Sequence, residues 1–494
     1  MLQPVTLSMP IIARPQASAA SAEESPPDPL DHVSRSNADH PMCRLDPEQA
    51  AQEQCKLAGQ VTCAGLPPLF ASAGLLFPDS HGKIKHMAFQ FGNVEFDRPL
   101  PEETRSAVLG MYGQLMRNMA PDSRFTIVCA DQRGVDSIHR LVEETGTDPA
   151  RVTVVAAETV KGFSIWIRDS MLPVRMPDGR TLLMIQDRTY WPGPEDARVP
   201  ALIDGAHANL DSSPHPALRI DGGNLVSNRH QVLVGSDSVE HTRARLQELA
   251  QDPERLQDIR KFYEAWTGQE VNLADESSLA RMWRDVPVLV FEKAFQKDVL
   301  VVGADDPTTP IKEEQPAFHI DMCVTPIGEN KMLVGSPALA IEAFSKLSAE
   351  ERASVNQAMA RQAGLDPDSD VIGELIAANN SPQCQANYDH VARQLAAEGY
   401  EVERMPSMVG LRTTWKLPYL TYNNCMMEVY PGEDGETVRK VYLPTYGCEP
   451  LDKIAIEIYR NNGFEVVPLE MAAISKLEGA IRCSTYAVER DLGS

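Results

Sequence analysis

The chain has 494 residues, of which 43% are hydrophobic and 23% charged, an ordinary composition for a soluble globular protein that buries a substantial core. Its 46 basic and 70 acidic residues give a formal net charge of −24, which argues against a binder of nucleic acid or of anionic membranes, since both need basic surface. The nine cysteines are scattered and include no Cys-x-x-Cys pair, which argues against a disulfide scaffold and a zinc ribbon and favours a cytoplasmic protein with reduced thiols. No apolar run reaches the length of about 18 residues that a membrane span needs.

The first 60 residues differ in composition from the rest. The stretch from Pro15 to Pro47 is rich in Ala, Ser, Pro, Asp and Glu and has no apolar periodicity, so we expect residues 1–60 to form a disordered tail. Such a tail is either a dispensable extension or an export signal of a bacterial effector, because signals of specialised secretion systems are often rich in these residues. Residues 61–82 are expected to form a linker or a packing arm, since Leu66–Phe77 is apolar.

From about Lys83 onwards, strand-like and helix-like patterns alternate, which predicts an α/β fold. A helix is expected at 101–118, because Pro101 and the acids Glu102 and Glu103 suit a first helical turn. Further helices are predicted at 134–145, 238–266, 275–284, 337–346, 349–362, 386–398 and 449–462. The predicted strands are 86–91, 124–130, 151–156, 171–176, 181–187, 217–220, 224–235, 288–291, 299–302, 319–326, 331–335, 401–405, 420–429, 438–443 and 465–468. The charged stretch at about 238–285 is interpreted as a helical insertion, and the helices are too irregularly spaced for a TIM barrel.

Two segments place ionic side chains where an apolar strand ends. In the first, the run from Phe163 leads into Arg168 and Asp169, which taken alone is as easily a surface ion pair. In the second, Asp221-Gly222-Gly223-Asn224 separates two apolar runs. Its paired glycines allow a positive φ and a close backbone approach. The second segment is either a plain tight turn or a turn that directs Asp221 inward.

Two further segments carry nucleophilic or titratable groups. In Phe318-His319-Ile320-Asp321, a strand would put His319 and Asp321 on one face, which suits catalysis better than a metal site, because no second clustered histidine is nearby. In the last segment, Cys483 follows the glycine turn at Gly479 and stands next to Arg482. A neighbouring cation lowers the pKa of a thiol, so Cys483 is a candidate nucleophile, although most free cysteines are small buried hydrophobes.

Together, and in this order, the four segments resemble the guanidine-modifying, or pentein, superfamily, which includes agmatine, arginine and protein-arginine deiminases. The similar motifs are Trp166-Ile-Arg168-Asp169, Asp221-Gly-Gly-Asn224, His319-Ile-Asp321 and Gly479–Thr485, with Tyr422-Asn-Asn-Cys and Val441-Tyr-Leu-Pro-Thr-Tyr-Gly similar to the penultimate strand pair of that superfamily. The resemblance covers roughly residues 83–492. It implies that residues 83–494 form one catalytic domain, an α/β propeller of five blades with pseudo-fivefold symmetry and the site at its axis.

The resemblance also implies a role for each motif residue. Cys483 would attack the guanidinium carbon, His319 would act first as the acid and then as the base, and Asp221 would orient His319. Asp169 and Asp321 would bind the planar guanidinium as bidentate carboxylates. Trp166, Arg168 and Asn224 would belong to the substrate-binding set. No metal and no cofactor is implied.

The substrate stays open between free arginine, agmatine and peptidyl-arginine. Arg482 before the cysteine is similar to arginine deiminases, whereas Ser170 and Met171 are closer to the protein-arginine type. An enzyme for free arginine would need a cation for the α-carboxylate, for which Arg412 and Arg482 are candidates.

Three alternatives to a deiminase remain at this point. An amidinotransferase of the same fold would share the nucleophile, a non-catalytic binding module would keep only the fold, and a secreted effector would modify protein arginines of a host. The expected partner is in each case a small cationic guanidino compound or a protein arginine, with no nucleic acid and no membrane, and the oligomeric state is open.

Overall fold

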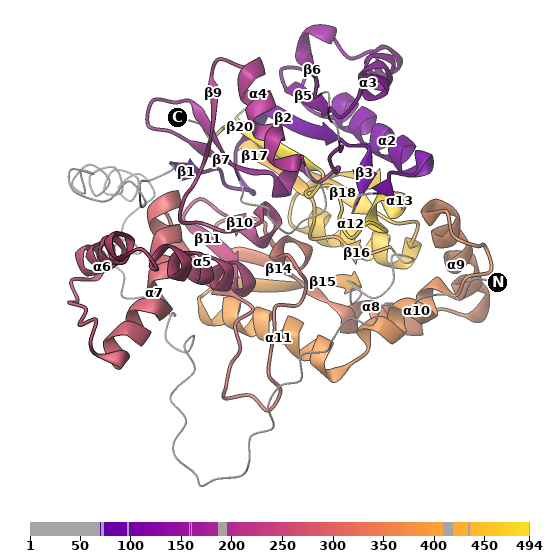
Figure 1. Cartoon of the computed structure of the whole chain (residues 1–494). Helices are drawn as coiled ribbons and strands as arrows, with labels where there is room; N and C mark the ends of the chain where they lie inside the picture. Colours follow the sequence, from indigo (N-terminus) through magenta and orange to yellow (C-terminus); the bar gives the residue numbers. More distant parts are fainter. Residues whose placement is uncertain are drawn as a thin grey trace, which may run out of the picture.

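The structure is a computed structural model of the chain, drawn in Figure 1. The described residues are 70, 74–95, 98–157, 159, 161–185, 195–408, 418–432 and 435–493. The predicted tail 1–60 and Arg412 lie outside these residues, as does most of the predicted arm before residue 74.

The described strands form five sheets with one shared pairing scheme and a separate two-stranded ribbon. In each of the five sheets, a central strand pairs antiparallel with one neighbour and parallel with the other. In four sheets the antiparallel neighbour directly precedes the central strand in the chain. In the fifth it is the last strand, β20 (Thr485–Asp491), which pairs with β2 (Lys83–Phe91) and so brings the two ends of the folded chain into one sheet.

The strands divide by their place in this scheme. The other central strands are β8 (Thr181–Ile185), β11 (Gln231–Gly235), β14 (Lys331–Ser336) and β18 (Thr437–Thr445). Their antiparallel neighbours are β7 (Met171–Arg175), β10 (Leu225–Ser227), β13 (Val324–Pro326) and β17 (Met426–Pro431). The parallel neighbours are β5 (Arg124–Cys129), β9 (Leu210–Pro214), β12 (Asp298–Val302), β15 (Glu401–Met408) and β19 (Glu465–Glu470). β1 (Leu75–Leu76), β6 (Val152–Ala156) and β16 (Leu420–Thr421) extend three of the sheets, and β3 (Val94–Glu95) with β4 (Arg98–Pro99) forms the ribbon.

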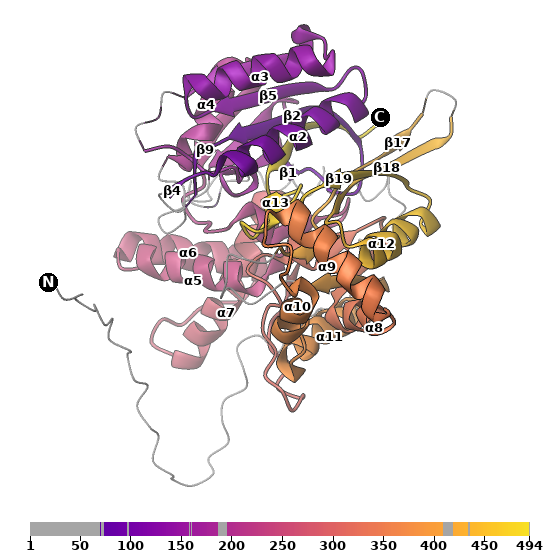
Figure 2. The ribbon, with the colours of Figure 1, turned by 90° about the vertical axis from the view of Figure 1, so that its right-hand side faces the viewer.

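Helices lie where the chain crosses from a central strand to its parallel neighbour, because a parallel pair cannot be joined by a tight turn. α2 (Glu102–Asn118) joins β2 to β5, α4 (Val199–Ala206) joins β8 to β9, and α12 (Glu449–Asn461) joins β18 to β19. Two of the crossovers are longer. One holds α5 (Ser236–Leu249), α6 (Pro253–Thr267) and α7 (Glu276–Phe295), and the other holds α8 (Pro337–Ser345), α9 (Ala349–Ala363), α10 (Val371–Asn379) and α11 (Pro382–Ala397). Figure 2 shows α2 and α3 (Gln132–Thr145) alongside the sheet that contains β2 and β5.

Local sequence explains where several helices begin and end. α2 begins after Pro101 with two acids in its first turn, as predicted. In α3 the Asp131 side chain accepts a hydrogen bond from Gly134 N, and Gly146 ends the helix at a φ of 64°. The helical prediction for 238–266 is confirmed as the two helices α5 and α6.

Two of the predicted strands do not form at all, and those predicted at 224–235, 319–326 and 420–429 form only in part. Residues 288–291 belong to α7, a 20-residue helix with Pro287 in its interior, because a short apolar run that is buried on a helix has the same composition as a buried strand. Residues 217–220 are buried or half-buried but take no place in a ladder. None of the described helices is long and apolar enough to cross a membrane.

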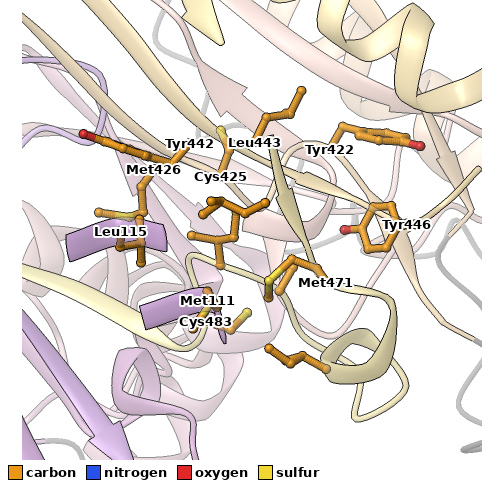
Figure 3. Packing of buried hydrophobic residues seen from close by; sticks show 14 of the residues in the cluster. Met111, Leu115, Tyr422, Cys425, Met426, Tyr442, Leu443, Tyr446, Met471 and Cys483 are labelled. Carbon is orange, nitrogen blue, oxygen red and sulfur yellow. The ribbon is translucent and has the colours of Figure 1, made fainter. Parts of the chain in front are cut away.

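Buried apolar side chains form three clusters, and the largest joins α2 and β2 to the sheet of β17, β18 and β19. Cys483 belongs to this cluster and is drawn in Figure 3 with its members Met111, Met471 and Tyr446. The cysteine is therefore held in densely packed surroundings, where a side chain has little freedom to move.

Candidate active site

A turn precedes the antiparallel strand of every sheet, and the four sequence motifs lie in four of these five turns. The turns are 167–169 before β7, 222–224 before β10, 320–322 before β13, 422–424 before β17 and 481–484 before β20. The motifs are thus equivalent positions of five sheets with the same pairing scheme. The remaining turn, 422–424, carries the asparagine pair Asn423 and Asn424.

The five turns contact one another in a closed ring. Hydrogen bonds between neighbouring turns run from Arg168 N to Cys483 O (3.1 Å), from Arg482 N to Asn424 O (3.3 Å), from Thr421 Oγ1 to Met322 O (2.7 Å) and from Ile320 N to Asn224 Oδ1 (3.1 Å). The ring closes where Gly222 meets the carbonyl oxygen of Arg168, which a Cβ at this position would overlap. Residues more than 300 positions apart are brought together in this way.

His319 and Asp321 do not lie on a strand, so this prediction is wrong. His319 has extended backbone (φ −131°, ψ 140°) and is followed by a single 3-10 turn, Ile320–Met322, before β13 begins. Both side chains are nevertheless buried, with residue exposures of 4% and 0%. The ring of turns, and not the alternation of a strand, brings them together.

The imidazole of His319 lies between two carboxylates. Its Nδ1 is 3.8 Å from Asp169 Oδ1, and its Nε2 is 3.7 Å from Asp221 Oδ2. Burial by itself would lower the pKa of His319, but Asp169, Asp221 and the Cys483 thiol together raise it well above its ordinary value. The ring packs so closely on Gly223 that a Cβ there would overlap Nδ1. His319 is therefore held in place, and the two carboxylates favour its protonated form.

Cys483 is 3% exposed, and the side chains of Asn424, Asp321 and His319 lie close to its sulfur. Asn424 Nδ2 donates to Sγ at 3.1 Å, and Asp321 Oδ2 lies 4.0 Å from Sγ. Burial, and then the Asp321 carboxylate, raise the pKa of the thiol, while His319 opposes them. The prediction that Arg482 lowers this pKa is wrong, because the pKa is raised and the guanidinium of Arg482 is paired with the carboxylates of Asp79 and Asp321.

Arg482 forms ion pairs on both sides of its guanidinium. Nη1 donates to Asp321 Oδ2 at 2.7 Å, while Nε and Nη2 donate to Asp79 at 3.2 and 2.9 Å. Nη2 also donates to the carbonyl oxygen of Leu225 at 2.8 Å. The guanidinium of Arg482 therefore binds groups within the protein, although the sequence predicted it as a candidate for binding a substrate carboxylate. The other oxygen of Asp321, Oδ1, is buried and has no hydrogen-bond partner among the described residues.

The three other motif residues support the turns. Trp166 Nε1 donates to Glu95 Oε1 at 3.0 Å, and its ring lies where a Cβ at Gly479 would be. Arg168 Nε donates to the carbonyl oxygen of Arg482 at 3.1 Å, and burial lowers the pKa of Arg168 to about 10. Asn224 Nδ2 donates to Ser238 Oγ at 2.8 Å, in addition to the bond that its Oδ1 accepts from Ile320 N.

Sequence reasoning missed Asp79 and Asn424. Asn424 lay within the Tyr422-Asn-Asn-Cys segment, and the similarity of that segment to the penultimate strand pair of the superfamily was the signal that the sequence offered. Asp79 had no such signal, since it lies in the predicted arm before the first long strand. Among the described residues, no group of three or more His, Cys, Asp and Glu side chains is arranged to hold a metal ion.

The comparisons with known proteins found similar solved structures only. No family model matches the chain, and no curated protein matches it. An agmatine deiminase from C. jejuni is 10% identical, with a TM-score of 0.48 and coverage of 85% of this chain and 96% of that chain. A putative peptidyl-arginine deiminase is 11% identical (TM-score 0.44, coverage 84% and 98%), and an amidinotransferase from Microseira wollei is 12% identical (TM-score 0.37, coverage 85% and 99%). All three are members of the pentein superfamily.

Proposed function

We propose that this chain hydrolyses a guanidinium group to a ureido group and ammonia, with Cys483 as the nucleophile. One observation carries the proposal: the ring of turns surrounds the Cys483 thiol and the His319 imidazole with three carboxylates, those of Asp169, Asp221 and Asp321. On this proposal the five sheets are the five blades of a pentein propeller, and the ring of turns encircles its axis.

A guanidinium is a planar cation whose N–H groups form a fork, and carboxylates are its natural acceptors. Asp169 and the buried Oδ1 of Asp321 are assigned to this binding. Arg482 holds the other oxygen of Asp321, so the carboxylate is oriented before the substrate arrives. Trp166, Arg168 and Asn224 take supporting roles, because each is bonded to a neighbouring turn or side chain.

Binding of the cation also activates the nucleophile. Without substrate, burial and Asp321 raise the pKa of Cys483 and favour its neutral thiol form. A bound guanidinium offsets the carboxylates and favours loss of the thiol proton to solvent. The thiolate then attacks the guanidinium carbon, forming an S–C bond, and His319, already protonated, gives its proton to the departing nitrogen as the C–N bond breaks.

The second half of the reaction returns the enzyme to its starting state. Neutral His319 takes a proton from water, whose oxygen attacks the carbon of the S-alkylthiouronium. The S–C bond breaks, Cys483 leaves as the thiolate, and the hydroxyl proton passes to ammonia. When the product leaves, the thiolate takes up a proton from solvent, which replaces the proton lost before the first attack. Asp221 keeps Nε2 of His319 in position throughout.

The test is turnover of arginine, agmatine and an arginine-rich protein by the full chain, with ureido product and ammonia both measured. Cys483→Ser should abolish product, while Cys384→Ser, which changes a half-buried thiol on α11, should leave it unchanged. Free ammonia without an added amine separates hydrolysis from amidino transfer. Undiminished ureido product in Cys483→Ser would refute the nucleophile, and no product from any guanidine would refute the proposed function.

A further inference from the structure

The side chain of Asn424 contacts Cys483 with both ends of its carboxamide. Nδ2 donates to Sγ at 3.1 Å, and Oδ1 accepts a hydrogen bond from the backbone N–H of Cys483 at 3.2 Å. The residue is 0% exposed, and its own backbone carbonyl accepts from Arg482 N at 3.3 Å. Resting on the function proposed above, we propose that Asn424 is a further catalytic residue, which donates a hydrogen bond to the sulfur whenever Cys483 is a thiolate.

The orientation of the amide follows from its partners. The backbone N–H of Cys483 can only donate, so the amide oxygen must face it, and the NH2 group must then face the sulfur. Met322 Sδ, 3.5 Å from Nδ2, is also only an acceptor, which agrees with this orientation. The donor therefore already faces the reacting atom and needs no rearrangement when substrate binds.

A donor at this place favours the charged form of the sulfur. A thiol accepts hydrogen bonds weakly, whereas an anion accepts them strongly, so an N–H aimed at the sulfur stabilises the thiolate relative to the thiol. Burial and Asp321 act in the opposite direction on Cys483, and its sequence neighbour Arg482 is bound to Asp79 and Asp321. Asn424 is thus positioned to assist both steps that have an anionic sulfur, the first attack and the final departure of the thiolate.

Asn423 is a matched control in the same turn. It is 1% exposed, and its Nδ2 donates to Thr325 Oγ1 at 3.0 Å and to the carbonyl oxygen of Leu333 at 3.1 Å. Its amide is as buried as that of Asn424, but only its Nδ2 is bonded, to the β13–β14 hairpin, and its Oδ1 has no hydrogen-bond partner among the described residues. A change at Asn423 reports what a lost buried amide does to the turn, separately from any effect on the sulfur.

The test measures alkylation of Cys483 by iodoacetamide against pH in the full chain, with the modified peptide quantified by mass spectrometry. Asn424→Asp keeps the acceptor for the Cys483 N–H and removes the donor, and Asn424→Ala removes both. At a pH below the wild-type midpoint, iodoacetamide should alkylate Cys483 in each variant up to about tenfold more slowly than in the wild type, which is the scale of a hydrogen bond to a charged group. The midpoint of alkylation should move to higher pH. Asn423→Ala should keep the wild-type midpoint.

Buried Cys323 serves as the internal monitor of folding, because it should stay unlabelled in every folded variant. The result is taken from whichever Asn424 variant keeps Cys323 protected. A wild-type midpoint in that variant, or an equal shift in Asn423→Ala, would overturn the inference. Alkylation needs no guanidine substrate. A shifted midpoint in a protein that makes no ureido product would therefore reject the proposed function alone, while normal product with an unshifted midpoint would reject the role of Asn424 alone.

Discussion

Asp79→Asn tests the support beneath the candidate site. The Asp79 carboxylate binds two buried arginines, Arg482 at 2.9 Å and Arg168 at 3.6 Å, and both of these guanidinium groups also hold the nucleophile turn. The side chains of the two arginines are 4% exposed and that of Asp79 is 16% exposed. The substitution keeps the shape of the side chain, removes its charge and replaces one acceptor oxygen with an NH2 donor, so both cations lose the carboxylate that they share.

The magnitude follows from burial. Removing one partner of a buried ion pair costs about 3–5 kcal/mol when the remaining charge is left without compensation. Arg482 keeps its ion pair with Asp321, so we expect Asp79→Asn to cost about 3 kcal/mol, the lower end of this range. Asp122 is the matched control, since it also holds two cations, Lys83 at 2.7 Å and Lys85 at 2.6 Å, but its side chain is 47% exposed. Exposed ion pairs contribute about 0–1 kcal/mol, so Asp122→Asn should be nearly neutral.

The assay is urea unfolding of the full chain at pH 7, repeated between pH 3 and pH 7. Burial raises the pKa of Asp79, but Arg482 and Arg168 outweigh it and hold the pKa below its ordinary value of 3.8. The stabilisation by Asp79 is then fully present above pH 3.8 and is lost as the pH falls through the pKa of the folded state. The difference between wild type and Asp79→Asn should therefore shrink below about pH 4. Equal losses in Asp79→Asn and Asp122→Asn at pH 7 would refute the reasoning.

Two other substitutions address the imidazole of the site and a buried histidine away from it. Gly223→Ala places a Cβ on Nδ1 of His319 and should lower turnover by about 10²–10⁴-fold. Gly205→Ala is the control, since it lies in open surroundings on α4 and should leave turnover unchanged. Normal turnover in Gly223→Ala would contradict the placement of His319. Burial, with smaller contributions from His207 and Arg124, lowers the pKa of His86 to about 3. As the pH falls below about 6.5, His86 is therefore protonated in the unfolded chain before it is protonated in the folded one. The free energy of unfolding then falls by about 1.4 kcal/mol per pH unit. His86→Gln should reduce that slope in urea titrations, and an unchanged slope would mean that other groups cause it.

The sequence predicted those parts of the fold that depend on nearby residues. The helix after Pro101 and the charged helices near 238–266 follow from capping residues and apolar periodicity, which act over a few turns. The run at 288–291 was misassigned because four apolar residues do not distinguish a buried helix from a buried strand. The repeated pairing scheme of the sheets could not be seen, because what the sheets share is hydrogen-bond topology, and their sequences differ.

In the candidate site, too, the sequence predicted some features and not others. The motif residues could be chosen from the sequence because each stands in a turn with a reactive or ionic side chain. The partners of those side chains could not, since Asp79 and Arg482 are 403 positions apart and meet only because β20 pairs with β2. The expected effect of Arg482 on Cys483 was wrong for this reason: adjacency in sequence places two residues on one turn, but the direction of each side chain depends on distant partners.

The charges around the ring give a physical reason for coupling substrate binding to activation. The carboxylates of Asp169, Asp221 and Asp321 lie around the Cys483 thiol and the His319 imidazole, whereas Arg168, Arg482 and Arg490 act on Asp79. A thiolate would add a negative charge beside these three carboxylates in buried surroundings, where uncompensated charge is strongly disfavoured. A bound monovalent cation offsets that charge and favours the thiolate. On the proposed function that cation is the guanidinium itself, so the nucleophile forms only when the carbon it attacks is in place.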